Sequence, residues 1–183
     1  MRRTTAAVAL ATAVTALAAT TAGTAAAAPV PAGHLALHSW TLLNEHGPGP
    51  NPGERLTARV DARTVDGRAR GHAVAQHVFT KDGTVRVEFD IDCLTVDVSG
   101  AVTVTGPIDR VTVTPVGGRP TTTRPGWRPE AGLTYYPADE HGKRRVGWAA
   151  SDYRDPNAPA KVTKCTPVPA DFWVIEGGTV LHR

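Results

Sequence analysis

The sequence predicts an all-β protein: a single antiparallel meander that either closes as a small β-barrel or packs as a β-sandwich, with Pro/Gly-rich loops. Valine and threonine dominate short runs that are punctuated by Gly, Pro, Asp and Asn, which is typical of strands joined by turns. Several runs alternate apolar and polar residues with a period of two. No window shows the sustained 3.6-residue apolar period of an amphipathic helix.

The clearest predicted strand covers residues 84–93, in which every second residue is apolar: Val85, Val87, Phe89, Ile91 and Cys93. A period of two places these side chains on a buried face and their neighbours in water. A tight turn at residues 81–84 precedes the strand, and residues 69–80 are its expected hairpin partner. Another alternating run, 56–63, comes earlier and is followed by a turn at Asp66-Gly67.

The chain after Cys93 continues the same pattern. Residues 94–98 form the next predicted strand, Ser99-Gly100 a turn, and residues 101–105 a further strand. Gly106-Pro107 interrupts this strand, which predicts a bulge or bend before it resumes. The shorter candidate strands are 34–43, 108–114, 133–136, 145–151, 171–176 and 179–182, which brings the total to about ten.

Three Pro/Gly-rich stretches break the strand pattern: residues 44–53, 115–132 and 155–169. Proline removes a ladder donor and fixes the backbone, so none of these stretches can be a central strand. The expected meander leaves exposed edges, and either barrel closure or the packing of two sheets would remove them. The sequence leaves both arrangements open.

Residues 1–27 have the pattern of a secretory signal peptide. Arg2 and Arg3 form a positive start, an uncharged Ala/Thr-rich stretch follows, and the small residues before Pro29 suit cleavage. Because proline next to the cut hinders cleavage, we place the cut after Ala27. The sequence therefore predicts a signal peptide at 1–27 and a single secreted β-domain at 28–183.

The charge balance argues against a nucleic-acid binder. The chain carries 20 Lys+Arg against 17 Asp+Glu. Removal of residues 1–27 would take away Arg2 and Arg3 and no acid, so the basic excess nearly disappears. No strong basic stripe remains, and no later stretch approaches a membrane span. The sequence also shows no glycine-rich strand-to-helix loop, so we expect no nucleotide and no other cofactor.

Cys93 and Cys165 are the two cysteines of the chain. In an oxidising compartment a lone pair is expected to form a disulfide, and two cysteines are too few for a Cys-rich zinc module. The bridge would attach the third Pro/Gly-rich stretch, 155–169, to the strand that ends at Cys93.

The segment GTVRVEFDIDCLTV at residues 83–96 continues into GAVTVTG at 100–106. It resembles a pattern of small secreted actinobacterial proteins, some of which are labelled repetin-like. RVGW at 145–148, Cys165 and EGG at 176–178 resemble the C-terminal half of that group, whereas Val98-Ser99 departs from its tighter turn. The resemblance implies a secreted all-β domain, and it implies neither an activity nor functional residues.

The sequence offers few groups for catalysis or metal binding. Glu88, Asp90 and Asp92 form an acidic stripe along one strand face, which suits either a carboxylate site or a solvated face balanced by cross-strand Arg59, Arg63 or Arg86. We favour the solvated face. His34 and His38 would lie about 13 Å apart on a strand, too far for one metal. No serine lies in G-x-S-x-G, so the sequence predicts no catalytic residue and no metal site.

The long loop at 115–132 carries the best candidate ligand surface, made of Trp127, Arg124 and Arg128. A tryptophan flanked by arginines suits contact with a sugar or an anionic wall polymer, so a cell-wall or carbohydrate surface is the expected partner class. The alternative is that Trp127 covers a barrel end or sheet edge. Trp40, Trp148 and Trp173 lie in strand-like runs and are expected in the core.

These observations favour a secreted, non-enzymatic binding module, extracellular or associated with the envelope, over two alternatives. The first alternative is a secreted enzyme that uses carboxylates such as Asp90 or Asp92. The second is a structural protein of the cell surface. An apolar cavity with a few inward polar groups would favour the binding module, and converging carboxylates in a cleft would favour the enzyme.

Overall fold

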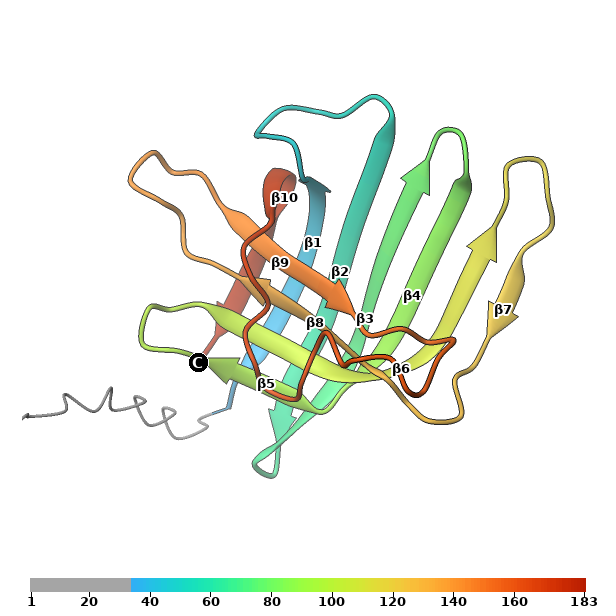
Figure 1. The fold of residues 1–183 in the computed structure, drawn as a ribbon. Helices are drawn as coiled ribbons and strands as arrows, with labels where there is room; N and C mark the ends of the chain where they lie inside the picture. The colour runs from blue at the N-terminus through green and yellow to red at the C-terminus, as the bar shows by residue number, and fades with distance from the viewer. Residues whose placement is uncertain (1–33) are drawn as a thin grey trace, which may run out of the picture.

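The computed structural model describes residues 34–183, which fold into ten β-strands and the loops between them (Figure 1). The predicted signal peptide at 1–27 lies outside the described residues. No helix within 34–183 is long and apolar enough to span a membrane. The strands are β1 (Ala36–Asn44), β2 (Glu54–Val65), β3 (Arg68–Phe79), β4 (Gly83–Ile91), β5 (Cys93–Val96), β6 (Val102–Thr114), β7 (Thr121–Thr123), β8 (Glu130–Tyr135), β9 (Arg145–Ala150) and β10 (Phe172–His182).

Eight of the strands close into an antiparallel barrel. The hydrogen-bonded order is β1-β2-β3-β4-β6-β8-β9-β10, and β10 pairs with β1 again. β5 and β7 are short extra strands that pair with β6. Because successive barrel strands are neighbours, the predicted meander is confirmed, and of the two predicted arrangements the protein adopts the barrel.

Closure depends on a change of partner along β6. The second half of β6 pairs with β4, whereas its first half pairs with β5 and β8. The change falls at Gly106, where an added Cβ atom would lie 1.8 Å from the carbonyl oxygen of Asp90. The bend predicted at Gly106-Pro107 is therefore present. In Figure 1, β1 to β4 stand nearly upright, and β8, β9 and the first half of β6 cross in front of them.

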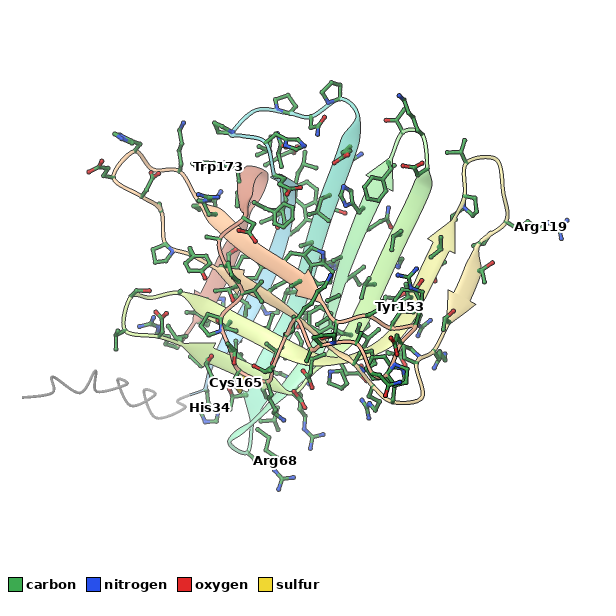
Figure 2. The ribbon with its side chains drawn as sticks, in the orientation of Figure 1. His34, Arg68, Arg119, Tyr153, Cys165 and Trp173 are labelled. Atoms are coloured by element: carbon green, nitrogen blue, oxygen red, sulfur yellow. A yellow bond between two sulfur atoms is a disulfide. The ribbon has the colours of Figure 1, made fainter. Side chains whose placement is uncertain are left out.

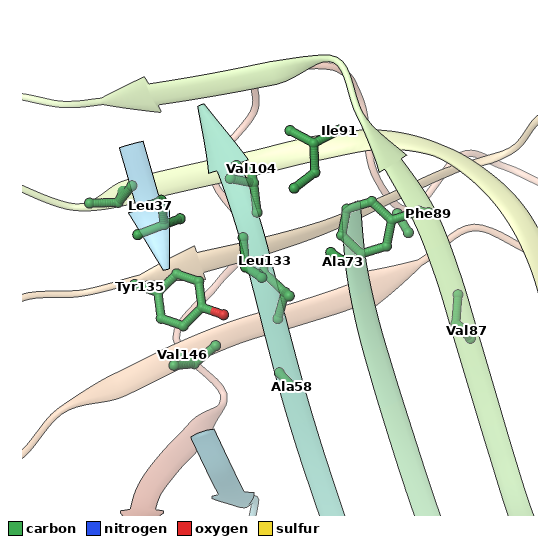
Figure 3. Packing of buried hydrophobic residues seen from close by; sticks show 14 of the residues in the cluster. Leu37, Ala58, Ala73, Val87, Phe89, Ile91, Val104, Leu133, Tyr135 and Val146 are labelled. Carbon is green, nitrogen blue, oxygen red and sulfur yellow. The ribbon is translucent and has the colours of Figure 1, made fainter. Parts of the chain in front are cut away.

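Of the alternating residues predicted to be buried, Val87, Phe89 and Ile91 face the barrel interior (Figure 3). Cys93 is buried too, but beneath the loop on the outer face, to which its disulfide joins it. Phe89 and Ile91 of β4 pack against Leu37, Val104 and Leu133 from other strands, and all five are at most 4% exposed. Tyr135 also lies in this filled part, and burial raises the pKa of its phenol. Large side chains therefore close the interior at this level.

The loop between β9 and β10 lies across the outer faces of β6, β8 and β9. The Cys93–Cys165 disulfide attaches it to the start of β5, as predicted (Figure 2 labels Cys165). The backbone N–H groups of Cys165 and Val168 donate to the hydroxyls of Thr105 and Thr134. This loop is ordered and explains why two outward-facing threonines are fully buried.

Several details differ from the sequence-based expectations. The strand expected at 84–93 ends at Ile91, because Asp92 donates its N–H to Thr105 at the β6 bend and a separate β5 begins at Cys93. The stretches 171–176 and 179–182 form one strand, β10, in which Gly177 absorbs a positive φ.

The loop expected at 115–132 contains a three-residue edge strand, β7. Its last three residues, 130–132, begin the central strand β8, which pairs with both β6 and β9. Trp40 faces outward and is 40% exposed, so its assignment to the core is wrong. Trp173 also lies outside the core, under the guanidinium of Arg145 at 4.5 Å, whereas Trp148 packs against the core as expected.

Candidate functional site

The barrel is open at the end where β2 begins and β3 ends, and the opening forms a cleft of about 350 Å³. We call it the barrel-mouth cleft. One side is formed by inward-facing side chains of β2, β3 and β4, and the other by β9 and the loop after it. The residues at this cleft are Leu56, Ala75, His77, Phe79, Val85, Val87, Trp148, Ala150, Ser151, Asp152, Tyr153, Arg154 and Lys161.

Small and large side chains along the strands explain why the cleft is empty where the rest of the barrel is full. Ala75 and Ala150 supply only methyl groups at this level. One level deeper, Phe89 is fully buried and its ring stacks on Trp148 with centroids 6.2 Å apart. Trp148 therefore forms the boundary between the filled core and the cleft.

Aromatic rings make up much of the cleft wall. The rings of His77 and Phe79 lie 3.8 Å apart between centroids on β3. Tyr153, on the loop that follows β9 (Figure 2), faces the cleft from the other side. Flat apolar walls around a volume of this size are typical of sites for small molecules.

The rim of the cleft carries charge with an excess of cations. Arg154 pairs with Asp152 at 3.3 Å, and His77 Nε2 lies 3.4 Å from a carboxylate oxygen of Glu54. The Arg154–Asp152 contact pairs one cation with one anion of the rim. The Lys161 ammonium forms no ion pair among residues 34–183, so it is the cation left over for a ligand.

A second hollow lies outside the barrel, on the outer faces of β1 to β4. It has a volume of about 560 Å³. We call it the outer groove; it is lined by Trp40, Thr57, Ala58, Arg59, Asp61, His72, Val74, Gln76, Arg86 and Glu88. Its chemistry differs from that of the cleft, because polar and charged side chains dominate.

Glu88 is the best-connected charge of this outer face. Its carboxylate accepts from Arg86 at 3.1 Å and lies 3.3 Å from His72 Nε2 and 3.8 Å from Arg110. Burial alone would raise the pKa of Glu88, but the hydrogen bond and charge of Arg86, together with Arg110 and His72, outweigh burial and lower it. At neutral pH the Glu88 carboxylate is therefore ionised, and these contacts fix its position.

The predicted acidic stripe is a paired, outward-facing set. Asp90 lies 3.7 Å from Arg128 and 3.8 Å from His72, and Asp92 lies 2.8 Å from Lys164. Of the arginines expected to balance the stripe, Arg86 does so, but from the same strand, β4. The cross-strand arginine at Glu88 is Arg110 of β6. The solvated-face interpretation of these carboxylates agrees with this pairing.

The three residues of the predicted ligand surface differ in their surroundings. Arg124 lies 3.4 Å from Asp109 and Arg128 lies 3.7 Å from Asp90, so both guanidinium groups face carboxylates of the barrel wall. Trp127 between them is 38% exposed. Neither hollow described above includes these three residues.

Glu130 and Asp92 are the carboxylates that come nearest to a catalytic arrangement. Burial, followed by the charge of Asp92, raises the pKa of Glu130 despite nearby Lys164 and Arg128. One carboxylate oxygen of Glu130 is buried without a hydrogen-bond partner among the described residues. Neither carboxylate lines the cleft or the groove, and Asp92 serves to anchor Lys164 beside the disulfide.

The part of the chain that the structure describes contains no group of three or more His, Cys, Asp or Glu side chains placed to bind a metal ion. The nearest approach is His72 with Glu88 and Asp90, in which the contacts are ion-pair distances of 3.3 and 3.8 Å. The two contacts use different ring nitrogens of His72, Nε2 toward Glu88 and Nδ1 toward Asp90, so the three side chains do not converge on one point.

Sequence reasoning missed both hollows. Trp40 could have been placed by parity: Leu37, Ser39, Thr41 and Leu43 point inward, so Trp40 between them points outward. The cleft left a weaker signal in the small residues Ala75 and Ala150. Whether such a gap stays open depends on the strands opposite, which the sequence does not show.

The fold and the cleft define a closed, meandering eight-stranded β-barrel with an apolar opening at one end. Comparisons with family models, with curated protein sequences and with solved structures found no match for the chain. The resemblance to small secreted actinobacterial proteins stays a prediction.

Proposed function

We propose that this protein is a secreted, non-enzymatic binding domain that takes a small, flat, apolar molecule with an anionic group into the barrel-mouth cleft. The observation that carries the proposal is the cleft itself, with aromatic walls above a filled core and Lys161 at its rim. Eight-stranded barrels have room for one small ligand where side chains leave a gap. The apolar walls would bind the body of the ligand, and Lys161 would pair with its charge.

Other features support binding over the two alternatives. Asp90 and Asp92, the carboxylates of the enzyme alternative, already face cations on the outside of the barrel. Closure removes most of the edges that assembly could use, because most strands are paired on both sides. The edges that remain are β5 and β7, of four and three residues, and the part of β10 beyond Trp173, which pairs with β1 alone. The disulfide and the leader-like residues 1–27 support secretion.

Titration with anilinonaphthalene sulfonate tests this proposal, because that probe combines flat aromatic rings with one anion. We expect a saturable rise in probe fluorescence at one probe per chain. Ala150→Phe should abolish the signal by filling the cleft, and Lys161→Gln should weaken binding about tenfold by removing the rim charge. Ala138→Phe and Lys143→Gln, at exposed positions away from the cleft, are the matched controls.

The proposal is wrong if the probe binds without saturation, or if Ala150→Phe and Ala138→Phe bind it equally well. Circular dichroism of each variant shows whether the barrel is intact, so loss of fold is not mistaken for loss of the cleft. For secretion, the intact mass of exported protein should correspond to a chain that starts at Ala28. An exported chain that keeps residues 1–27 would contradict the signal peptide.

A further inference from the structure

A row of side chains runs straight across the four strands of the outer groove and continues onto β6 beside it. Trp40 of β1 pairs in register with Arg59 of β2, which pairs with Val74 of β3. Val74 pairs with Glu88 of β4, and Glu88 with Arg110 of β6. Since neighbouring strands lie about 4.8 Å apart, this row is about 19 Å long. It is long enough for a short stretch of a linear polymer.

Two glycines of β10 leave room for the Trp40 ring beside the barrel wall. Gly178 is opposite Trp40 in the β1–β10 register, and Gly177 is next to it. A Cβ atom at Gly177 would lie 2.1 Å from the Trp40 carbonyl oxygen and 2.6 Å from ring atom Cε3. Gly177 therefore leaves the space in which the ring lies against the barrel wall, with part of its surface in solvent.

The groove is lined by as many arginines as acidic side chains. Arg59 and Arg86 are matched by Asp61 and Glu88, and Arg86 donates to Glu88 at 3.1 Å. Gln76 adds a neutral amide, which accepts from Arg86 at 3.5 Å. A groove with no net charge does not select a charged polymer, but it presents several hydrogen-bond donors and acceptors close to an aromatic ring.

We propose that the outer groove binds a chain of a neutral polysaccharide, with Trp40 stacked on one sugar ring. A pyranose ring has an apolar C–H face and a rim of hydroxyls. The Trp40 ring suits the face, and planar groups such as those of Arg59, Asp61 and Gln76 suit the hydroxyls. This site is separate from the barrel-mouth cleft and does not rest on the function proposed for it.

Affinity electrophoresis tests the inference, with hydroxyethyl cellulose, laminarin, soluble starch or glycol chitin in the gel. Trp127→Ala is the matched control for Trp40→Ala, because both tryptophans are exposed to nearly the same extent, 38% and 40%. We expect wild-type protein to be retarded by at least one of these polymers. Retardation should weaken at least tenfold in Trp40→Ala, remain in Trp127→Ala, and persist in about 0.5 M NaCl.

Three results would overturn the inference: no retardation by any of the four polymers, equal retardation of Trp40→Ala and wild type, or retardation that is abolished by salt. Loss in Trp127→Ala alone would place a sugar site on the long loop instead of the groove. Arg59→Gln gives a second measure with little risk to folding, because Arg59 is exposed; it should weaken retardation without changing the melting temperature. Unchanged retardation in both Arg59→Gln and Trp40→Ala would also contradict the inference.

Discussion

At the scale of single residues, two glutamates sit in opposite electrostatic situations on the same barrel. Glu88 is 14% exposed and is held by Arg86, which keeps its pKa low in spite of burial. Burial and the charge of Asp92 raise the pKa of Glu130. One of its carboxylate oxygens is buried without a hydrogen-bond partner among residues 34–183. Ionised Glu88 therefore stabilises the fold, whereas ionised Glu130 costs stability.

These situations predict opposite pH dependence for two conservative substitutions. At pH 7, Glu130→Gln should raise the free energy of unfolding by up to about 1 kcal/mol, because it removes a poorly compensated charge. Glu130 takes up its proton as the pH falls through its raised pKa, so the advantage should vanish below the ordinary value of 4.5. Thermal melts of the variant and wild type at several pH values measure the difference.

Glu88→Gln should lower stability at pH 7 by about 1 kcal/mol, through loss of the Arg86 and Arg110 contacts. Wild-type Glu88 keeps its advantage above pH 4.5 and loses it as the pH falls further, through its lowered pKa. The two variants should thus deviate from wild type in opposite directions at neutral pH. Deviations in the same direction would contradict the charge assignments.

At the scale of elements, the close approach at Gly106 lets β6 change partners, from β5 and β8 along its first half to β4 along its second half. Gly106→Ala should destabilise the protein by about 3 kcal/mol, because its Cβ would overlap the Asp90 carbonyl in a backbone that cannot move alone. Gly126→Ala is the control, since a Cβ there meets nothing within 4 Å. Urea unfolding measures both. Equal stability of the two variants would show that β4 and β6 do not meet as described.

The loop between β9 and β10 is held by one covalent link and by buried threonine hydroxyls. Replacing both Cys93 and Cys165 by serine should cost up to about 4 kcal/mol, since the bridge spans a sequence separation of 72 residues. Limited proteolysis should then cut within residues 155–169 faster than in the wild type. Unchanged stability together with free thiols in the exported wild-type protein would refute the bridge.

At the scale of the whole molecule, local patterns predicted the strands, and long-range contacts decided the rest. The hairpin at Asp66-Gly67 followed from its sequence, and both residues have the positive φ of such a turn. The choice of a barrel rested on the pairing of β4 with β6, which joins segments on either side of β5. Periodicity within a single strand carries no information about such a pairing.

The candidate sites were less predictable than the fold, for reasons that particular residues make clear. Trp127 stood out in sequence because arginines flank it, yet those arginines face Asp90 and Asp109. Trp40 was passed over because it lies within a strand, although the inward parity of Ser39 and Thr41 turns it to solvent. The cleft arises where Ala75 and Ala150, far apart in sequence, leave space at the same end of the barrel.

The most direct test of the central claim, that the open end of the barrel binds a ligand, is NMR chemical-shift mapping during titration with anilinonaphthalene sulfonate. We predict that the largest amide shifts fall on residues lining the cleft, such as Ala75, His77, Ala150 and Tyr153, with a single dissociation constant. Shifts centred on Trp127, or scattered over the outer surface without saturation, would contradict the claim.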